Sequence, residues 1–127
     1  MAIFTHVCLG ANNLAKSAKF YDASLGALGI KNLGPMGDTG VLYGSSGPEF
    51  IILKPRDGKP ASSANGGTTG FAAPTRAAVH AFHAAGLANG GTDDGEPGPR
   101  AFTPTAYAAY LRDPDGNKIC AYCFLPE

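Results

Sequence analysis

The sequence consists of two similar halves joined by a polar segment, and this repeat restricts the fold more than any other feature. Each half begins with a short apolar run, continues with apolar residues at helical spacing, and ends in further short apolar runs. One offset aligns Asn13 with Thr75, Phe20 with Phe82, and residue 6 with residue 68. Half a chain of this size buries little apolar surface alone, so both halves must pack around a shared core.

The first half predicts one helix and four strands. Apolar spacing predicts a helix over about residues 14–28, with Asn13 as its N-cap. Short apolar runs separated by Gly, Pro, Asp and Ser predict strands over residues 3–10, 30–33, 40–43 and 50–54. The polar run that follows, residues 55–67, has the composition of a linker.

The second half repeats the order. Thr75 is the expected N-cap of a helix that ends before Gly90. Strands are predicted over residues 68–73, near 92, over 107–112 and over 118–125, with a Pro/Gly loop over 96–105. We therefore predict a single α+β domain over residues 1–127: module one about 1–55, linker about 55–67, module two about 68–127. The alternation of strand and helix would also suit a ferredoxin-like fold.

Charge and hydropathy exclude several classes of partner. Lys plus Arg and Asp plus Glu are both 10, so no basic excess indicates nucleic-acid binding. No apolar run approaches the roughly 20 residues that a membrane helix needs. The first residues also lack the basic flank and apolar core of a signal peptide. We expect a cytoplasmic protein that binds neither nucleic acid nor a membrane.

The three cysteines fit that expectation. They are an odd number without a secretory signal, which is typical of a reducing compartment. Cys120 and Cys123 form a C-x-x-C pattern, but residues 119–125 resemble a strand, on which residues three apart point to opposite faces. The two thiols should therefore not meet, and Cys120 is expected to be a small buried residue rather than a nucleophile.

Three segments resemble one family, in the order in which that family has them. Residues 5–7 (T-H-V) followed by 14–21 (L-A-K-S-A-K-F-Y) resemble its opening strand and helix. Residues 71–79, with Phe82, resemble the start of its second module, and 112–119 (R-D-P-D-G-N-K-I) resemble its C-terminal hairpin. On these residues the chain is similar to the vicinal oxygen chelate superfamily, the glyoxalase / bleomycin resistance / dioxygenase group. The resemblance implies two paired βαβββ modules that form a half-open barrel around a small-molecule cavity, and a homodimer.

The resemblance also implies where a metal ion would bind. In metal-dependent members, the first and last strands of each module each supply one ligand, usually His, Gln or Glu. Here the four positions are His6, Ile52 (or Ile51 if the register differs by one), Thr68 and Cys120. Only His6 matches, whereas an open catalytic site keeps about three protein ligands. We therefore predict no metal or cofactor; the alternative is a divalent metal, or a soft ion that Cys8 helps His6 and Cys120 to hold.

Other residues predict a binding cavity. Arg100 and Phe102 lie where similar proteins carry residues of the pocket mouth, and Arg suits a carboxylate or phosphate. An ordinary surface loop is an equal alternative for that segment. Strand alternation predicts that Tyr110 and Tyr122 point to the same side of the sheet as Cys120. A cavity lined by aromatic rings suits a flat or apolar ligand. The candidate substrate-binding residues are Tyr43, Ile52, Thr68, Arg100, Phe102, Tyr110, Cys120 and Tyr122.

Four further polar residues receive no chemical role. His80 and His83 lie three apart on the second predicted helix and flank its apolar stripe, so we expect partly exposed surface histidines. Asp113 and Asp115 are expected only to form the turn between the last two strands.

Three classes of function, and one intermediate between the first two, follow from these residues. The first, which we predict, is a protein that binds a small molecule in its cavity without a complete metal site. The second is a metal-dependent lyase or dioxygenase, of the kind of lactoylglutathione lyase. Between them lies a metal-free enzyme with His6 as catalytic general base and Arg100 or a tyrosine stabilising an anion. The third is a structural or regulatory dimer with a fully packed cavity.

Overall fold

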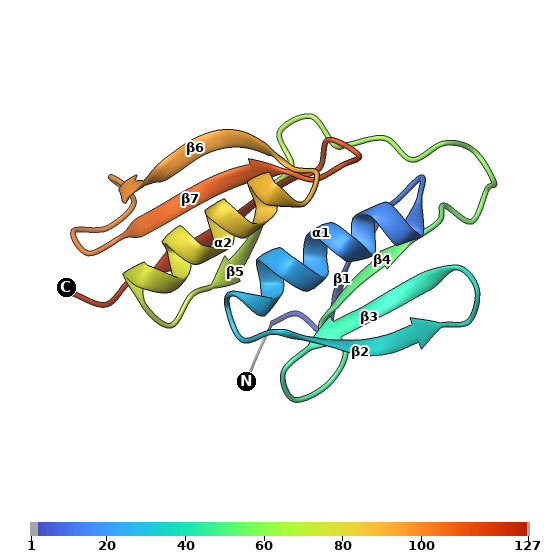
Figure 1. The fold of residues 1–127 in the computed structure, drawn as a ribbon, viewed down its shortest axis with the longest axis horizontal. Coiled ribbons are helices and arrows are strands. Elements are labelled where there is room, and N and C mark those ends of the chain that lie inside the picture. Colours follow the sequence, from blue (N-terminus) through green and yellow to red (C-terminus); the bar gives the residue numbers. More distant parts are fainter. Residues whose placement is uncertain (1–2, 127) are drawn as a thin grey trace.

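The computed structural model describes residues 3–126, so residues 1, 2 and 127 of the predicted domain lie outside it. Module one consists of β1 (Val7–Gly10), α1 (Leu14–Gly26), β2 (Lys31–Met36), β3 (Gly40–Gly44) and β4 (Phe50–Leu53). Module two consists of β5 (Thr69–Ala72), α2 (Arg76–Ala88), β6 (Thr92–Pro99), β7 (Tyr107–Arg112) and β8 (Lys118–Cys123). The two predicted βαβββ modules and the α+β class are confirmed (Figure 1).

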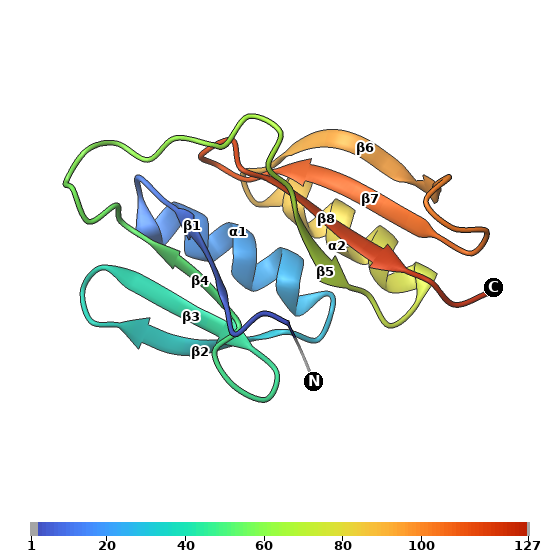
Figure 2. The ribbon, with the colours of Figure 1, turned by 180° about the vertical axis from the view of Figure 1, so that it is seen from behind.

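Each module forms its own four-stranded sheet, with the orders β1-β4-β3-β2 and β5-β8-β7-β6. The first and last strands of each module pair in parallel, and all other neighbours are antiparallel. The edge strands β1 and β5 face each other at the centre of the molecule (Figure 2). Because no strand pairing joins the sheets within residues 3–126, the arrangement is open and not a closed barrel.

Both helices begin at the predicted N-caps. The side chain of Asn13 accepts a hydrogen bond from the Lys16 amide, and that of Thr75 accepts one from the Ala78 amide, each at 3.0 Å. These bonds satisfy amides that have no partner within the helix. Helix α1 ends at Gly26, before the predicted residue 28, because the chain turns at Gly29, where φ is +83°.

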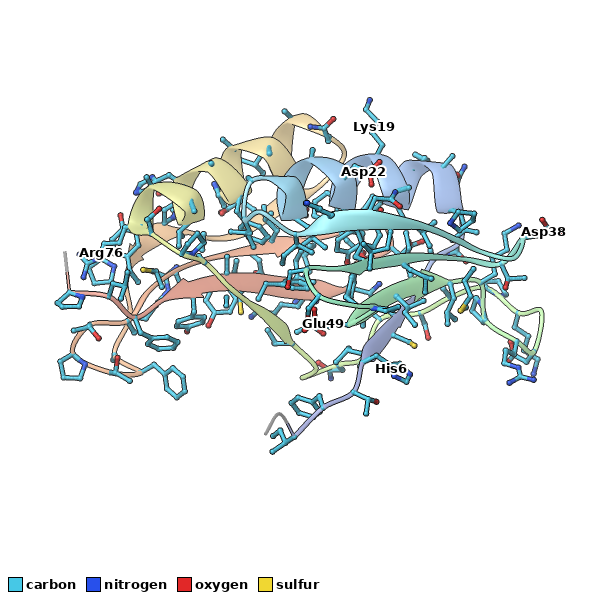
Figure 3. All side chains as sticks on the ribbon, turned by 90° about the horizontal axis from the view of Figure 1, so that it is seen from below. His6, Lys19, Asp22, Asp38, Glu49 and Arg76 are labelled. Atoms are coloured by element: carbon cyan, nitrogen blue, oxygen red, sulfur yellow. The ribbon has the colours of Figure 1, made fainter. Side chains whose placement is uncertain are left out.

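The core lies between the helices and the sheets. Figure 3 shows α1 and α2 on the same side of both sheets, with His6 projecting from the opposite side. One buried cluster contains residues of both modules, and the rings of Phe50 and Phe71 meet across the boundary with centroids 5.0 Å apart. Neither module covers its own apolar side completely, so the shared core holds the two sheets side by side.

The turn between β7 and β8 attaches module two to α1. Asp113 Oδ2 accepts a hydrogen bond of 2.6 Å from the Tyr21 hydroxyl, and Asp115 Oδ2 accepts one of 2.9 Å from the Ser17 hydroxyl. The other Asp115 oxygen accepts from the Asn12 backbone and side chain. The prediction that these two aspartates only form the turn was therefore incomplete, because they also join the modules.

Three further expectations need correction. Strand β1 begins at Val7 rather than residue 3, and Ile3 and Phe4 are exposed. The predicted Pro/Gly loop is strand as far as Pro99, with bulges that let β6 continue past its glycines. His83 is 7% exposed and not a surface residue, because its ring packs inward and bonds to β6.

Within the described residues, no helix has the length and apolar character needed to cross a membrane.

Candidate functional site

Strand alternation separates the two sides of β7 and β8. Ala109, Leu111, Ala121 and Cys123 belong to the buried core beneath the helices. Their neighbours Tyr110, Cys120 and Tyr122 therefore lie on the open side, and Tyr110 pairs directly with Cys120 in the sheet. Side chains from the segment before β7 and from the segment after β8 lie beside them. We call the whole group the aromatic face: Arg100, Phe102, Tyr110, Cys120, Tyr122 and Phe124.

The rings of the aromatic face contact one another. The Tyr110 and Tyr122 rings are perpendicular, with centroids 5.9 Å apart and hydroxyl oxygens 2.5 Å apart. Phe124 stacks on Tyr122 at 5.5 Å, and the Phe102 ring lies 5.8 Å from Tyr122. Phe102 is nevertheless 73% exposed, so much of this aromatic surface contacts solvent.

Arg100 lies along β6 with its guanidinium 5.5 Å from the centre of the Tyr110 ring. The guanidinium donates three hydrogen bonds to backbone carbonyls, at Glu96, Gly98 and Pro99. A Cβ at residue 95 would lie 3.2 Å from Arg100 Nη2, and one at residue 98 would lie 3.5 Å from Nη1. The glycines of the bulged strand thus leave the space in which the guanidinium lies.

Positive charge exceeds negative charge around the Tyr110 ring. Lys118 Nζ lies 5.1 Å from the ring centre, but it also lies 3.5 Å from Asp94, which pairs with Arg112 at 2.9 Å. One carboxylate is therefore shared by two cations. Among residues 3–126, no carboxylate forms an ion pair with Arg100. An aromatic ring attracts cations, but it does not neutralise their charge.

The polar groups between these cations stay protonated at neutral pH. Burial raises the pKa of the Cys120 thiol to about 11, although Lys118, Tyr110 and Arg100 each lower it. Burial, followed by the hydrogen bond with Tyr122, raises the pKa of the Tyr110 hydroxyl well above its usual value. Cys120 is 3% exposed, as expected of a small buried residue, and its raised pKa disfavours the thiolate that a nucleophile needs.

Two hollows border β5, one on each side. A groove of about 550 Å³ lies against the aromatic face, lined by Phe102, Tyr122, Phe124, Leu125 and residues 70–74. A cavity of about 680 Å³ lies on the other side, against the N-terminal segment and the end of α1, and includes Phe4, Glu49 and Phe71. The groove is therefore continuous with the rings of the aromatic face.

The structure distributes the predicted site residues over three places. Arg100, Phe102, Tyr110, Cys120 and Tyr122 come together on the aromatic face. Tyr43 and Ile52 are 0% and 1% exposed and lie in the core, where the Tyr43 hydroxyl donates to Asp22 at 2.8 Å. Thr68 is exposed just before β5, and His6 is exposed just before β1, with Nδ1 3.0 Å from the Thr5 hydroxyl.

The four positions associated with a metal ion do not fit one. Ile52 faces the core, so alternation places its neighbour Ile51 on the open side, as the other register would have it. Neither isoleucine nor the hydroxyl of Thr68 replaces a His or carboxylate ligand, and a metal-bound Cys120 would have to be a thiolate. Within residues 3–126, no group of three or more His, Cys, Asp or Glu side chains is arranged to hold a metal ion.

Several residues of the site could not be identified, or were not identified, from the sequence. Lys118 shares the alternation of Cys120, so strand periodicity alone could have placed it on the open side. Phe124 follows the end of β8, where periodicity carries no signal. Gly95 and Gly98 had the composition of a loop, and nothing local indicated that their missing side chains accommodate Arg100.

Known sequences and structures resemble this chain over nearly its whole length. The sequence model of the Glyoxalase/Bleomycin resistance protein/Dioxygenase superfamily matches residues 3–121. A glyoxalase/bleomycin resistance protein from Albidiferax ferrireducens T118 is 50% identical, with 95% of this chain and 98% of that chain covered and a TM-score of 0.86. No curated protein is significantly similar to the chain.

More distant structures share the fold alone. A putative glyoxalase from Bacillus halodurans is 22% identical, with 96% of each chain covered and a TM-score of 0.75. A glyoxalase-related enzyme from Fulvimarina pelagi is 18% identical, with 96% of this chain and 88% of that chain covered and a TM-score of 0.72.

Proposed function

Since this chain belongs to the glyoxalase/bleomycin resistance protein/dioxygenase superfamily, we propose that it binds a small planar organic molecule on its aromatic face, without a metal ion. The observation that carries this proposal is the contact between four rings, those of Phe102, Tyr110, Tyr122 and Phe124, beside a groove. Small-molecule sites are typically concave and largely apolar, with a few placed polar groups.

The exposed edge of this group favours binding over simple packing. Phe102 and Phe124 are 73% and 46% exposed, although each contacts Tyr122. A planar molecule inserted beside them would remove apolar surface from water and add ring contacts at favourable distances.

Calorimetric titration with 2-naphthamide and 2-naphthoate tests the proposal. We expect saturable binding of at least one probe, and we expect Phe102→Ala to weaken it about tenfold because a stacking partner is removed. Phe4→Ala is the matched control, since Phe4 is also exposed but lines the cavity on the other side of β5. If Phe4→Ala weakened the affinity for the probe and Phe102→Ala did not, the ligand would bind elsewhere, which would contradict the proposal.

Metal content tests the second part of the proposal. Protein purified without a chelator should contain no stoichiometric metal, and its melting temperature should not rise with Ni²⁺, Zn²⁺, Mn²⁺ or Fe²⁺, because a ligand of the native state raises that temperature. Near-stoichiometric metal that is lost, together with stability, in His6→Ala would overturn the metal-free site. It would instead support a lyase or dioxygenase.

We further propose that the protein acts in the cytoplasm as a homodimer. Cys8, Cys120 and Cys123 form no disulfide within residues 3–126, which suits a reducing compartment. Exposed apolar side chains near both ends of the described chain, at Ile3 and Leu125, favour association with a second copy.

A further inference from the structure

We infer that the planar ligand carries a carboxylate, which binds between the Arg100 guanidinium and the Tyr110–Tyr122 hydroxyl pair. This inference rests on the proposed function and specifies its ligand. The two parts of the site come from different elements: Arg100 follows β6, whereas the tyrosines lie on β7 and β8. The sheet brings them together because residue 95 of β6 pairs with Tyr110, and Tyr110 pairs with Cys120.

Arg100 provides a cation that is already oriented. A guanidinium has five N–H groups, and the carbonyls of Glu96, Gly98 and Pro99 accept three hydrogen bonds from Arg100. Carbonyl oxygens orient the group without cancelling its charge, and no carboxylate among residues 3–126 pairs with it. The remaining N–H groups and the charge are available to an anion, and an oriented side chain loses less entropy on binding.

The tyrosine pair provides a neutral donor next to this cation. The two hydroxyl oxygens are 2.5 Å apart, so one hydroxyl donates to the other. The hydrogen of the accepting hydroxyl is then free to point at a ligand oxygen. Because the pKa of Tyr110 is raised, its hydroxyl keeps its proton at neutral pH, and the pair can donate to a carboxylate. A hydrogen bond to a charged acceptor is roughly twice as strong as one between neutral groups.

The local charge selects against other ligand classes. A cationic ligand would meet Arg100 and Lys118, and the carboxylate of Asp94 already pairs with both Lys118 and Arg112. A neutral ligand would leave the Arg100 charge without a partner. A carboxylate on a planar scaffold suits both features of the face, because Tyr122 both lines the groove for the rings and belongs to the hydroxyl pair, which lies on the same face as Arg100.

The decisive experiment compares 2-naphthoate with 2-naphthamide, which differ in charge but share a planar scaffold. For the wild-type protein we expect the carboxylate to bind about tenfold to a hundredfold more tightly, as a charge-assisted contact should. Arg100→Gln should remove that preference, so that the two probes bind with similar affinity. Arg56→Gln, which changes an exposed arginine of the linker, is the matched control and should bind both probes as the wild type does.

Two further measurements do not depend on the folding of the Arg100 variant. Raising the salt concentration should weaken binding of 2-naphthoate but not of 2-naphthamide to the wild-type protein. Tyr122→Phe, which breaks the hydroxyl pair, should also reduce the preference for the carboxylate. Equal affinity for the two probes, with no effect of salt, would overturn this inference and leave the proposed function intact. Absence of binding by either probe would count against the proposed function itself.

Discussion

His83 on α2 and Asp93 on β6 form a contact that explains why His83 is buried, although the sequence predicted a surface histidine. The His83 ring is nearly buried, and its Nε2 donates to Asp93 Oδ1 at 2.7 Å. This hydrogen bond, followed by one from the Gly95 amide, lowers the pKa of Asp93. The pair therefore holds the middle of α2 against the start of β6, the strand whose bulges position Arg100.

The lowered pKa of Asp93 predicts a loss of stability in acid. A carboxyl with a lower pKa in the folded chain stabilises the fold above its unfolded pKa, and this contribution is lost as the pH falls through its folded pKa. We expect the free energy of unfolding to fall as the pH drops below the ordinary Asp pKa of 3.8, and this part of the fall should be absent in Asp93→Asn. Urea unfolding from pH 7 to pH 2 measures it.

The exposed Asp38 in the turn between β2 and β3 offers a control for that measurement. Asp38→Asn should retain the acid sensitivity of the wild-type protein. If Asp93→Asn and Asp38→Asn showed the same pH profile, the contact with His83 would not contribute to stability.

At the scale of elements, the packing of α2 depends on a glycine within the helix. A Cβ at Gly86 would lie 2.3 Å from Leu111 Cδ1 on β7 and 3.2 Å from Phe20 Cε1 on α1. The missing side chain therefore allows α2 to approach both a strand of its own module and the helix of the other module. Glycine is a poor helix former, so we attribute its presence in α2 to this close packing.

Gly86→Ala should destabilise the protein despite the better helix propensity of alanine. Alanine gains roughly 1 kcal/mol over glycine in a helix, whereas overpacking a core costs about 1–3 kcal/mol, so we expect a net loss of up to about 2 kcal/mol in urea unfolding. Gly26→Ala is the matched control, because a Cβ there meets nothing within 4 Å. An equal gain in stability for both variants would show that α2 can shift without cost.

Strand β6 shows a similar effect of glycine on the space available to a side chain. Its Pro and Gly residues predicted a loop, yet the strand pairs with β7 as far as Pro99, with register shifts on both sides of Gly95. Each bulge interrupts the ladder and tolerates residues that a regular strand would exclude. The irregular strand leaves space for the guanidinium that a regular strand with larger side chains would fill.

At the scale of the molecule, side-chain contacts join the two separate sheets. No strand pairing crosses between the modules within residues 3–126. The core contact between Phe50 and Phe71 and the bond from Tyr21 to Asp113 cross instead. Such contacts make the modules mutually dependent, and we expect a single cooperative unfolding transition.

Phe71→Leu tests this dependence. The substitution keeps an apolar side chain but removes the edge-to-face contact with Phe50, so we expect a loss of about 1 kcal/mol. Amide hydrogen exchange should accelerate in both sheets by a similar factor, because the globally protected amides of both modules open in the same event. Faster exchange confined to module two would show that the modules unfold independently. Phe4→Leu, at an exposed position, should change neither sheet.

Local patterns in the sequence determined the elements and part of the site. The caps Asn13 and Thr75 and the two-residue alternation of β7 and β8 act between neighbours in the chain, so they predicted both helices and placed Tyr110, Cys120 and Tyr122 on one side. The resemblance carried by residues 5–7 and 112–119 indicated how the modules pair, which propensities alone do not specify.

Only the tertiary structure decided which residues of different elements contact one another and which of them are buried. The position of Arg100 depends on bulges in a strand that pairs with β7, the burial of His83 depends on β6, and the burial of Tyr43 and Ile52 depends on which side α1 covers. Each outcome involves residues that are distant in sequence, and a shift of register by one residue would reverse the sides of a strand. Periodicity determines which residues share a side, whereas packing of the helices determines which side is buried.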